Sequence, residues 1–365
     1  MPADTARDTP DALPSVGVVI PTRNRKALLM TSLAGVLAQR DVELEVVVVD
    51  DGSTDGTAEA VRALADPRVR VLRNPASQGV VAARNRGVAA TGSGWVGFCD
   101  DDDLWAADKL ASQIDAARST GRRWAVTGAV GFESDGTARY LTLPQAGDRL
   151  AAELPWRNGV PGGCSNVVAE RRLFQDAGGF DPRLRVLADW ELWIRLARLC
   201  APATVPRALV GYRMHGSNMS TSSQGVLDEL HLVEMLSADL RAGCRLEPAW
   251  FHTWMAASML RGGDSRGAAA AFWRAASLRH PAPALRSLAC LVVPAPGRAL
   301  ARRIKNRGAA PLTAPPWLLD LLDEAPGEAD AIQARDPSRH RTGPDRATSP
   351  EGPPGTDWSP QTRLE

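Results

Sequence analysis

Four consecutive carboxylates, Asp100 to Asp103, stand directly after the apolar run Trp95–Cys99. This run contains Val and Phe and follows a glycine-rich turn, so it predicts a buried strand. Because like charges repel, four carboxylates at a strand end cost stability unless a cation compensates them. Oxygen ligands at such a place suit Mg²⁺ or Mn²⁺, hard ions that bridge protein carboxylates to substrate phosphates. A solvated acidic turn with a helix N-cap at Asp103 is the open alternative.

Polar residues also follow two other expected strands. Thr22 and Asn24 come after the first strand, where they either meet a nucleotide or form a plain turn and helix cap. Asp51 comes after the second strand, beside Gly52, which permits a tight chain reversal. An unpaired carboxylate there can accept hydrogen bonds from a nucleobase N–H or from ribose hydroxyls. The following Ser53–Asp55 offer N-caps for a helix, and that role does not account for the acidic pair before Gly52.

Two further charged side chains, both on expected helices, could take part in binding or catalysis. Arg84 lies about one and a half turns into an expected helix, a position suited to a base or phosphate contact from above a sheet. Asp189 stands at the start of another expected helix, where an isolated aspartate serves as an N-cap. A carboxylate can also act as the base that a displacement by a hydroxyl group requires.

The elements that must position these residues alternate between strand and helix from residue 15 to 130. Such alternation with short links predicts right-handed βαβ units and a mostly parallel sheet of the α/β class. The carboxyl ends of strands in such a sheet face the ligand crevice. The expected strands are Val16–Ile20, Leu44–Val49, Val69–Leu72 and Trp95–Cys99, and the expected helices are Lys26–Gln39, a segment from the Ser53–Asp55 caps to Ala65, and Gly79–Ala90.

The pattern changes after residue 120. A strand at Trp124–Glu133 is followed by a hairpin turn at Asp135–Gly136, and residues 142–168 are rich in loops. From about residue 225 to 306 the pattern is helical, with one helical hairpin around Gly262–Asp264. The remaining expectations are helices at Arg171–Ala177 and Asp189–Leu199, a β-branched stretch ending at Tyr212, and a disordered tail from about Asp323. Four tryptophans are expected in the core rather than as platforms on which a sugar stacks: Trp190, Trp193, Trp254 and Trp273.

The composition narrows the class of protein. The chain has 365 residues, with 44% hydrophobic and 23% charged residues, which is typical of a soluble globular protein. Its net charge of +1 recruits neither nucleic acid nor an acidic membrane through the global field. Five cysteines without a CxxC motif indicate reduced thiols in the cytoplasm. The N-terminus carries no hydrophobic signal, and no apolar run reaches the roughly 18 residues of a membrane span.

Taken in order, seven segments resemble the inverting family 2 glycosyltransferases, which use the GT-A fold. The resemblance covers roughly residues 15 to 222 and includes the metal-binding aspartate motif of that family. The segments are VGVVIPTRNR (16–25), VVVDDGSTDGT (47–57), NPASQGVVAARNRGVAAT (74–91), WVGFCDDDDLWAADKL (95–110), GGCSNVVAERRLFQDAGGFDPRL (162–184), DWELWIRLA (189–197) and YRMHGSNMS (212–220).

The resemblance implies roles for particular residues. Asp102 is the expected metal ligand, with the register of the aspartate motif open by one, and Asp189 is the expected catalytic base. His215 matches a residue that approaches the diphosphate or metal, and a structural role is equally open. Where the family commonly has Glu, this chain has Ala188. The implied nucleotide-side residues are Pro21, Thr22 and Asn24 in the pocket, Asp51 at the base, Arg84 at the base or diphosphate, and Asp100 at the ribose and metal.

These observations predict a metal-dependent inverting glycosyltransferase that uses Mg²⁺ or Mn²⁺. It would move a sugar from a UDP- or dTDP-linked donor to a hydroxyl acceptor, in the synthesis of cell-surface polysaccharide, glycolipid or glycoconjugate. A sugar-phosphate nucleotidyltransferase is one alternative, although no Gly-rich basic phosphate loop follows the first strand. A non-catalytic nucleotide-sugar-binding protein with a partner-recruiting helical region is the other.

The expected organisation has four parts. They are a flexible N-terminus (1–14), a GT-A domain (15–222), a helical extension (223–322) and a disordered tail (323–365). The segment Gly297–Gly308 carries five cations and two aliphatic residues spaced four apart. It is either a peripheral contact with the inner face of a membrane bearing a lipid-linked acceptor, or a solvated basic helix end.

Overall fold

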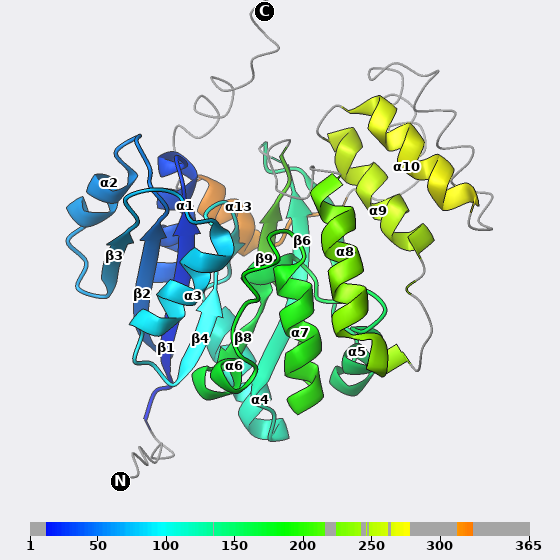
Figure 1. Ribbon diagram of the computed structural model, residues 1–365. Coiled ribbons are helices and arrows are strands. Elements are labelled where there is room, and N and C mark those ends of the chain that lie inside the picture. Colours follow the sequence, from blue (N-terminus) through cyan, green and yellow to red (C-terminus); the bar gives the residue numbers. More distant parts are fainter. Residues whose placement is uncertain are drawn as a thin grey trace, which may run out of the picture.

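Figure 1 shows the computed structural model of the chain, which describes residues 12–133, 135–215, 224–241, 246, 248–261, 264–277 and 312–323. Four predictions fall outside these residues and stay predictions: the flexible start before residue 12, the helical pattern over residues 278–306, the membrane contact at Gly297–Gly308, and the disordered tail after Asp323.

One sheet of nine strands forms the centre of the described structure, in the order β3-β2-β1-β4-β8-β6-β9-β5, with β7 paired to β6. Its first half consists of β1 (Ser15–Thr22), β2 (Glu43–Asp50), β3 (Val69–Arg73) and β4 (Trp95–Phe98). These four strands pair in parallel, as the sequence predicts. Thr22 is the register partner of Asp50, so β1 and β2 end at the same edge of the sheet.

The second half of the sheet is mixed. β8 (Val168–Glu170) pairs antiparallel with both β4 and β6 (Trp124–Phe132), while β9 (Ala203–Arg213) runs parallel to β6. β5 (Leu104–Trp105) and β7 (Ala138–Thr142) add antiparallel pairs, and β7 follows the hairpin turn predicted from the sequence. The expectation of a mostly parallel sheet therefore holds for the first half only. β5 and β8 are two and three residues long, too short to leave a strand pattern in the sequence.

Helices cover both faces of this sheet (Figure 1). Alternate residues of β2 divide between two hydrophobic layers, with Val46 and Val48 in one and Val47 and Val49 in the other, as expected for a strand buried on both faces. The first layer includes residues of α1 (Lys26–Leu37), α2 (Thr57–Ala63) and α4 (Lys109–Thr120); the second includes residues of α3 (Val80–Ala90), α5 (Gly147–Glu153), α6 (Arg171–Asp176) and α7 (Ala188–Leu199).

Two helix starts differ from the predictions. α2 begins after Gly56, whose φ of 79° is left-handed, and not at the Ser53–Asp55 caps. Asp55 instead accepts hydrogen bonds from the backbone N–H groups of Lys26, at 3.2 Å, and of Thr57, at 3.1 Å, which ties two loops together. α4 begins only at Lys109, so the aspartate block is followed by β5 and does not cap a helix.

The helical extension packs against α7. α8 (Gln224–Leu236), α9 (Pro248–Arg261) and α10 (Ser265–Ser277) contribute to the same hydrophobic layer as α7, and α9 with α10 forms the predicted helical hairpin. The last described helix, α13 (Pro316–Asp323), places Leu318 against Leu104 and Phe132 of the sheet. Within the described residues, no helix is long and apolar enough to cross a membrane.

Candidate functional site

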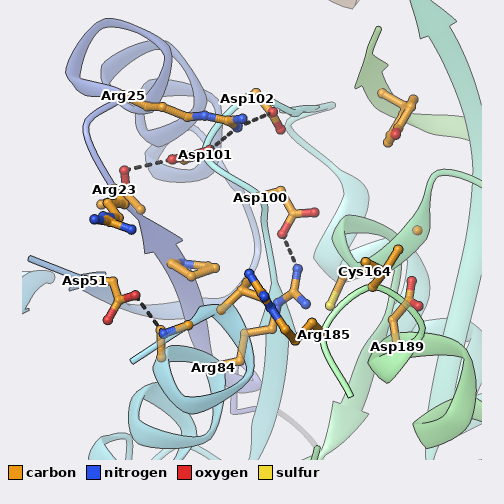
Figure 2. A pocket seen from close by; sticks show the side chains of 18 of the residues that line it. Arg23, Arg25, Asp51, Arg84, Asp100, Asp101, Asp102, Cys164, Arg185 and Asp189 are labelled. Carbon is orange, nitrogen blue, oxygen red and sulfur yellow. Dashed lines mark hydrogen bonds and ion pairs between the residues drawn. The ribbon is translucent and has the colours of Figure 1, made fainter. Parts of the chain in front are cut away.

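The aspartate block is held from the end of β1 by two side chains (Figure 2). Thr22 Oγ1 donates a hydrogen bond of 2.8 Å to Asp101 Oδ2. Arg25 Nη1 lies 3.1 Å from Asp101 Oδ1 and 2.7 Å from Asp102 Oδ2. Burial and the charge of Asp102 raise the pKa of Asp101 to about 7, against the opposing charge of Arg25. Arg25 therefore supplies part of the compensating positive charge that the block requires.

Ser165 and Arg213 fix the block from its other side. The backbone N–H of Asp100 donates to Ser165 Oγ at 2.9 Å, and Ser165 Oγ donates to Asp103 Oδ2 at 2.5 Å. Asp103 Oδ1 also accepts the backbone N–H of Arg213, at 3.0 Å. Burial and the charges of Asp102 and Asp100 raise the pKa of Asp103 well above its usual range. Asp103 is completely buried, so it supports the block from within, and the alternative of a solvated acidic turn is wrong.

Asp102 and His215 meet at the rim of this block. Asp102 Oδ2 lies 2.9 Å from His215 Nε2. Burial alone would raise the pKa of Asp102, but the hydrogen bond from His215 and the charge of Arg25 outweigh it and lower that pKa. A carboxylate oxygen and an imidazole nitrogen suit Mn²⁺, and Mg²⁺ binds through few protein groups while keeping water and phosphate ligands. The pair therefore fits a divalent ion shared with a diphosphate. Asp102 and His215 provide two ligands only. Among the described residues, no cluster of three or more His, Cys, Asp or Glu side chains is arranged to hold a metal.

Arg84 links the aspartate block to the opposite wall. Its Nη2 lies 2.5 Å from Asp100 Oδ1, and the guanidinium stands 5.5 Å above the ring centroid of Phe180. Arg84 is 4% exposed, and its buried Nε has no hydrogen-bond partner among the described residues. A buried, charged donor without a partner is costly in a folded protein. Within the described structure, Arg84 therefore keeps one buried donor unpaired beside its ion pair with Asp100.

Asp189 is the second residue of α7, and the helix N-cap is Leu187, so the alternative that Asp189 serves only as an N-cap is wrong. Its Oδ1 accepts the backbone N–H of Trp190 at 2.6 Å. Burial raises the pKa of Asp189 from 3.8 to about 6, with the charge of Arg84 opposing and the charge of Asp100 adding to the rise. A carboxyl group with this pKa is ionised at neutral pH and remains basic enough to accept a proton.

Asp51 is already saturated with hydrogen bonds from the loop before α3. Its two carboxylate oxygens accept four of them, from Asn74 Nδ2 (2.7 Å), Ser77 Oγ (2.7 Å), the N–H of Gln78 (2.8 Å) and the N–H of Gly79 (2.9 Å). Burial would raise the pKa of Asp51, but these bonds outweigh it and lower that pKa. Asp51 therefore holds the loop 74–79 in place at the edge of the site.

A pocket of about 650 Å³ brings most of the predicted residues together. Its lining includes seven of them: Pro21, Thr22, Asp51, Arg84, Asp100, Asp102 and Asp189. Asn24 and His215 do not belong to the lining. The Asn24 side-chain oxygen instead accepts the backbone N–H of Thr54 at 2.8 Å, which braces the loop after β2. His215 reaches the site through Asp102.

The pocket also contains residues that the sequence did not single out. Arg23, Arg25 and Arg185 bring three cations to its wall. Arg25 belongs to the segment VGVVIPTRNR (16–25), next to the predicted residue Asn24, so the sequence could have indicated it. No feature of the sequence around Arg185 indicates a role for that residue. Trp254 lines the pocket, although the sequence pattern placed it in the core. The core prediction is also wrong for Trp273, which is 65% exposed, and correct for Trp190 and Trp193.

The start of α7 is fastened by the helical extension. Glu229 of α8 accepts hydrogen bonds of 2.8 Å from both the backbone N–H of Val186 and that of Leu187. These two residues line the pocket immediately before Asp189. A carboxylate at a helix N-terminus satisfies unpaired donors and complements the helix dipole. Glu229 therefore positions the segment that carries Arg185 and Asp189.

Glu229→Ala should destabilise the protein by about 1–2 kcal/mol, because two backbone donors lose their acceptor. Denaturant unfolding of the full chain measures this difference. Asp228→Ala, a change at the exposed neighbouring carboxylate, is the matched control and should have no effect. Equal stability of the two variants would show that the contact with Glu229 contributes nothing.

The sequence is similar to a known protein family and to several of its members. A sequence profile described as "Glycosyl transferase family 2" matches residues 17–174. The chain is 30% identical over 242 residues to the succinoglycan biosynthesis protein ExoO of Rhizobium meliloti (strain 1021), covering 63% of this chain and 68% of that protein. It is 26% identical over 215 residues to the putative teichuronic acid biosynthesis glycosyltransferase TuaG of Bacillus subtilis (strain 168), covering 57% of this chain and 82% of that one.

A solved structure shares the fold. The crystal structure of S. aureus TarS 1-349 in complex with UDP-GlcNAc superposes with a TM-score of 0.50 at 18% identity, covering 74% of this chain and 82% of that one. At this identity the likeness concerns the fold alone. It confirms the α/β fold of GT-A type that the sequence predicts.

Proposed function

The chain belongs to glycosyl transferase family 2, and from that premise we propose that it transfers a sugar from a UDP- or dTDP-linked donor to a hydroxyl acceptor with inversion. As a member of this family the chain is a glycosyltransferase. This conclusion excludes the two alternative functions, a sugar-phosphate nucleotidyltransferase and a non-catalytic binding protein. The names of its relatives ExoO and TuaG refer to succinoglycan and teichuronic acid biosynthesis. They support a role in cell-surface polysaccharide synthesis. In this proposal residues 15–222 form the catalytic domain and 223–322 the helical extension.

One observation carries the proposal: a single pocket gathers candidate groups for both halves of the reaction. Arg84 and Asp100 come from α3 and the end of β4, while Asp189 comes from α7. A displacement at a sugar carbon needs stabilisation of the leaving diphosphate and a base for the incoming hydroxyl. The pocket has charged groups suited to each of these tasks.

The nucleotide side is assigned to the ends of β1 and β2. Pro21 and Thr22 line the pocket, and Asn24 braces the loop behind them. Asp51 is proposed to act at the base through the loop 74–79, which its four hydrogen bonds hold in place beside the pocket. Asp100 is proposed to hold the ribose.

The diphosphate is assigned to Arg84 and to a divalent ion. Asp102 and His215 would hold Mg²⁺ or Mn²⁺, which when bound supplies Lewis-acid stabilisation of the departing charge. Arg84 lines the pocket, and its guanidinium would bind phosphate oxygens, because a guanidinium in a water-poor site favours an anion strongly.

Asp189 is proposed as the base. Its carboxylate takes the proton of the acceptor hydroxyl while the acceptor oxygen forms a bond to the anomeric carbon. The bond from that carbon to the donor phosphate oxygen breaks, and its electron pair leaves with the nucleoside diphosphate. Direct displacement of this kind inverts the anomeric centre. The direct test is the release of nucleoside diphosphate from UDP- and dTDP-sugars.

We expect kcat to rise with pH and to reach half of its plateau near pH 6. The base must be ionised, and burial raises the pKa of Asp189 to about 6, so protonation below that pH removes the base. A rate profile between pH 4.5 and 8 measures this limb. The residual rate of Asp189→Asn should be flat over the same range; an unchanged limb in that variant would assign the titration to another group.

A further inference from the structure

The pocket has a second group of lining residues with a different chemistry. Besides its charged residues it is lined by three aromatic side chains, Tyr140, Tyr212 and Trp254, all half-buried. None of the three has a role in the nucleotide chemistry proposed above. Aromatic side chains in a concave site offer apolar faces with little conformational entropy to lose, and they bind flat apolar surfaces of a ligand.

The sheet register brings the two tyrosines to one face. Tyr140 of β7 and Tyr212 of β9 are both register partners of Gly131 of β6. Directly paired residues of neighbouring strands point to the same face of a sheet. A Cβ atom added at Gly131 would lie 2.1 Å from Tyr140 Cε1, so the Tyr140 ring rests on the strand at this glycine. Gly131 therefore makes room for an aromatic surface between β7 and β9.

Trp254 reaches the same pocket from α9 in the helical extension. α9 lies beyond residues 17–174, the part matched by the family profile. The neighbouring Phe251 and Met255 are buried in the hydrophobic layer that contains α7, and Trp254 packs against it. The hydrogen bonds of Glu229 fasten the extension to the segment before Asp189. The extension is thus in a position to shape the pocket beside the proposed base.

Two glycines join the aromatic surface to the base. Gly162 and Gly163 have φ values of 67° and 64°, which favour glycine. A Cβ atom at Gly162 would lie 3.9 Å from Tyr212 Cβ, and one at Gly163 would lie 3.7 Å from Asp189 Oδ2. These two adjacent glycines line the pocket between Tyr212 and the Asp189 carboxylate, and we call them the glycine floor.

We propose that Tyr140, Tyr212 and Trp254 form an acceptor subsite that holds a sugar ring, so that the acceptor hydroxyl belongs to a glycan. One face of a pyranose ring exposes C–H groups that stack on aromatic side chains, while its edge carries the hydroxyl groups. A ring on this surface directs one hydroxyl along the glycine floor to Asp189. The inference rests on the proposed function and adds its acceptor class.

The test is binding of cellobiose, lactose and maltose to the full chain, measured by saturation-transfer NMR in the presence of Mn²⁺ and UDP or dTDP. Trp254→Ala should weaken binding of at least one of these disaccharides by about tenfold, the usual scale for one aromatic contact. Trp254→Phe keeps a ring and should restore most of the affinity. Trp273→Ala, at an exposed tryptophan outside the pocket, is the matched control and should bind like the unmodified protein.

Tyr140→Leu on β7 gives a second variant in case Trp254→Ala does not fold, and it should show the same weakening. Equal affinity in the unmodified protein and in a folded Trp254→Ala or Tyr140→Leu variant would overturn the subsite. Absence of binding of all three disaccharides to the unmodified protein would overturn it as well. In either case nucleotide binding and donor turnover by the unmodified protein would leave the proposed function standing, whereas their absence would contradict the function itself.

Discussion

Asp189→Asn is expected to lower kcat by roughly 10²–10⁴-fold, the usual loss when a general base is removed. Asparagine has nearly the same shape, and its side-chain oxygen can still accept the Trp190 N–H that Asp189 accepts at 2.6 Å. It cannot take the proton of a hydroxyl group. Binding of the donor and of Mn²⁺, measured by calorimetry, should therefore persist while turnover falls.

Glu191 of the same helix turn provides the control for this prediction. Its carboxylate pairs with Arg195 of α7 and is outside the pocket lining. Glu191→Gln should retain turnover close to that of the unmodified protein. Loss of donor binding in Asp189→Asn together with loss of catalysis would make Asp189 a binding residue and would refute its assignment as the base.

Asp102→Ala is expected to reduce transfer by at least about 10³-fold, because the charge of the leaving diphosphate loses its metal bridge. The change also removes one partner of Arg25 and one of His215, so a loss of stability is expected with it. Asp102→Asn preserves the shape and separates the two effects. Mn²⁺ titration of each variant measures metal affinity independently of turnover.

Asp101→Asn is the comparison that decides the register of the motif. Asp101 is occupied by Thr22 and Arg25, whereas Asp102 also meets His215. Metal affinity should therefore fall much further in Asp102→Asn than in Asp101→Asn. The reverse order would move the metal to Asp101, and full turnover of Asp102→Ala in the presence of EDTA would refute metal dependence.

The sequence predicts the first half of the sheet because those strands carry their own signals. The run Val46–Val49 is apolar on both faces, as the two hydrophobic layers that share it require. β8 has no comparable signal, since its three residues become a strand only between β4 and β6. The same holds for the start of α2, where the left-handed Gly56 defines the boundary and the preceding hydroxyl and carboxyl groups brace loops. Tertiary neighbours decide such positions.

The sequence predicts those residues of the site that directly follow a strand of the parallel sheet. Asp51 and Asp100 follow parallel strands whose carboxyl ends share one edge, so their convergence follows from the topology. The saturation of Asp51 by the loop 74–79 depends on the path of that loop, which no spacing encodes. Glu229 and Trp254 act from the extension across long sequence separations. Their pattern in the sequence is that of ordinary amphipathic helices.

The most direct test of the account is a nucleoside-diphosphate release assay on the full chain. The enzyme would be incubated with UDP-, dTDP- and GDP-sugars in the presence of Mn²⁺ or Mg²⁺, with and without EDTA. We expect release from a UDP- or dTDP-sugar that depends on the metal and stops when EDTA is added. Release that continues undiminished in EDTA, or no release from any of these donors with metal present, would contradict the proposed mechanism.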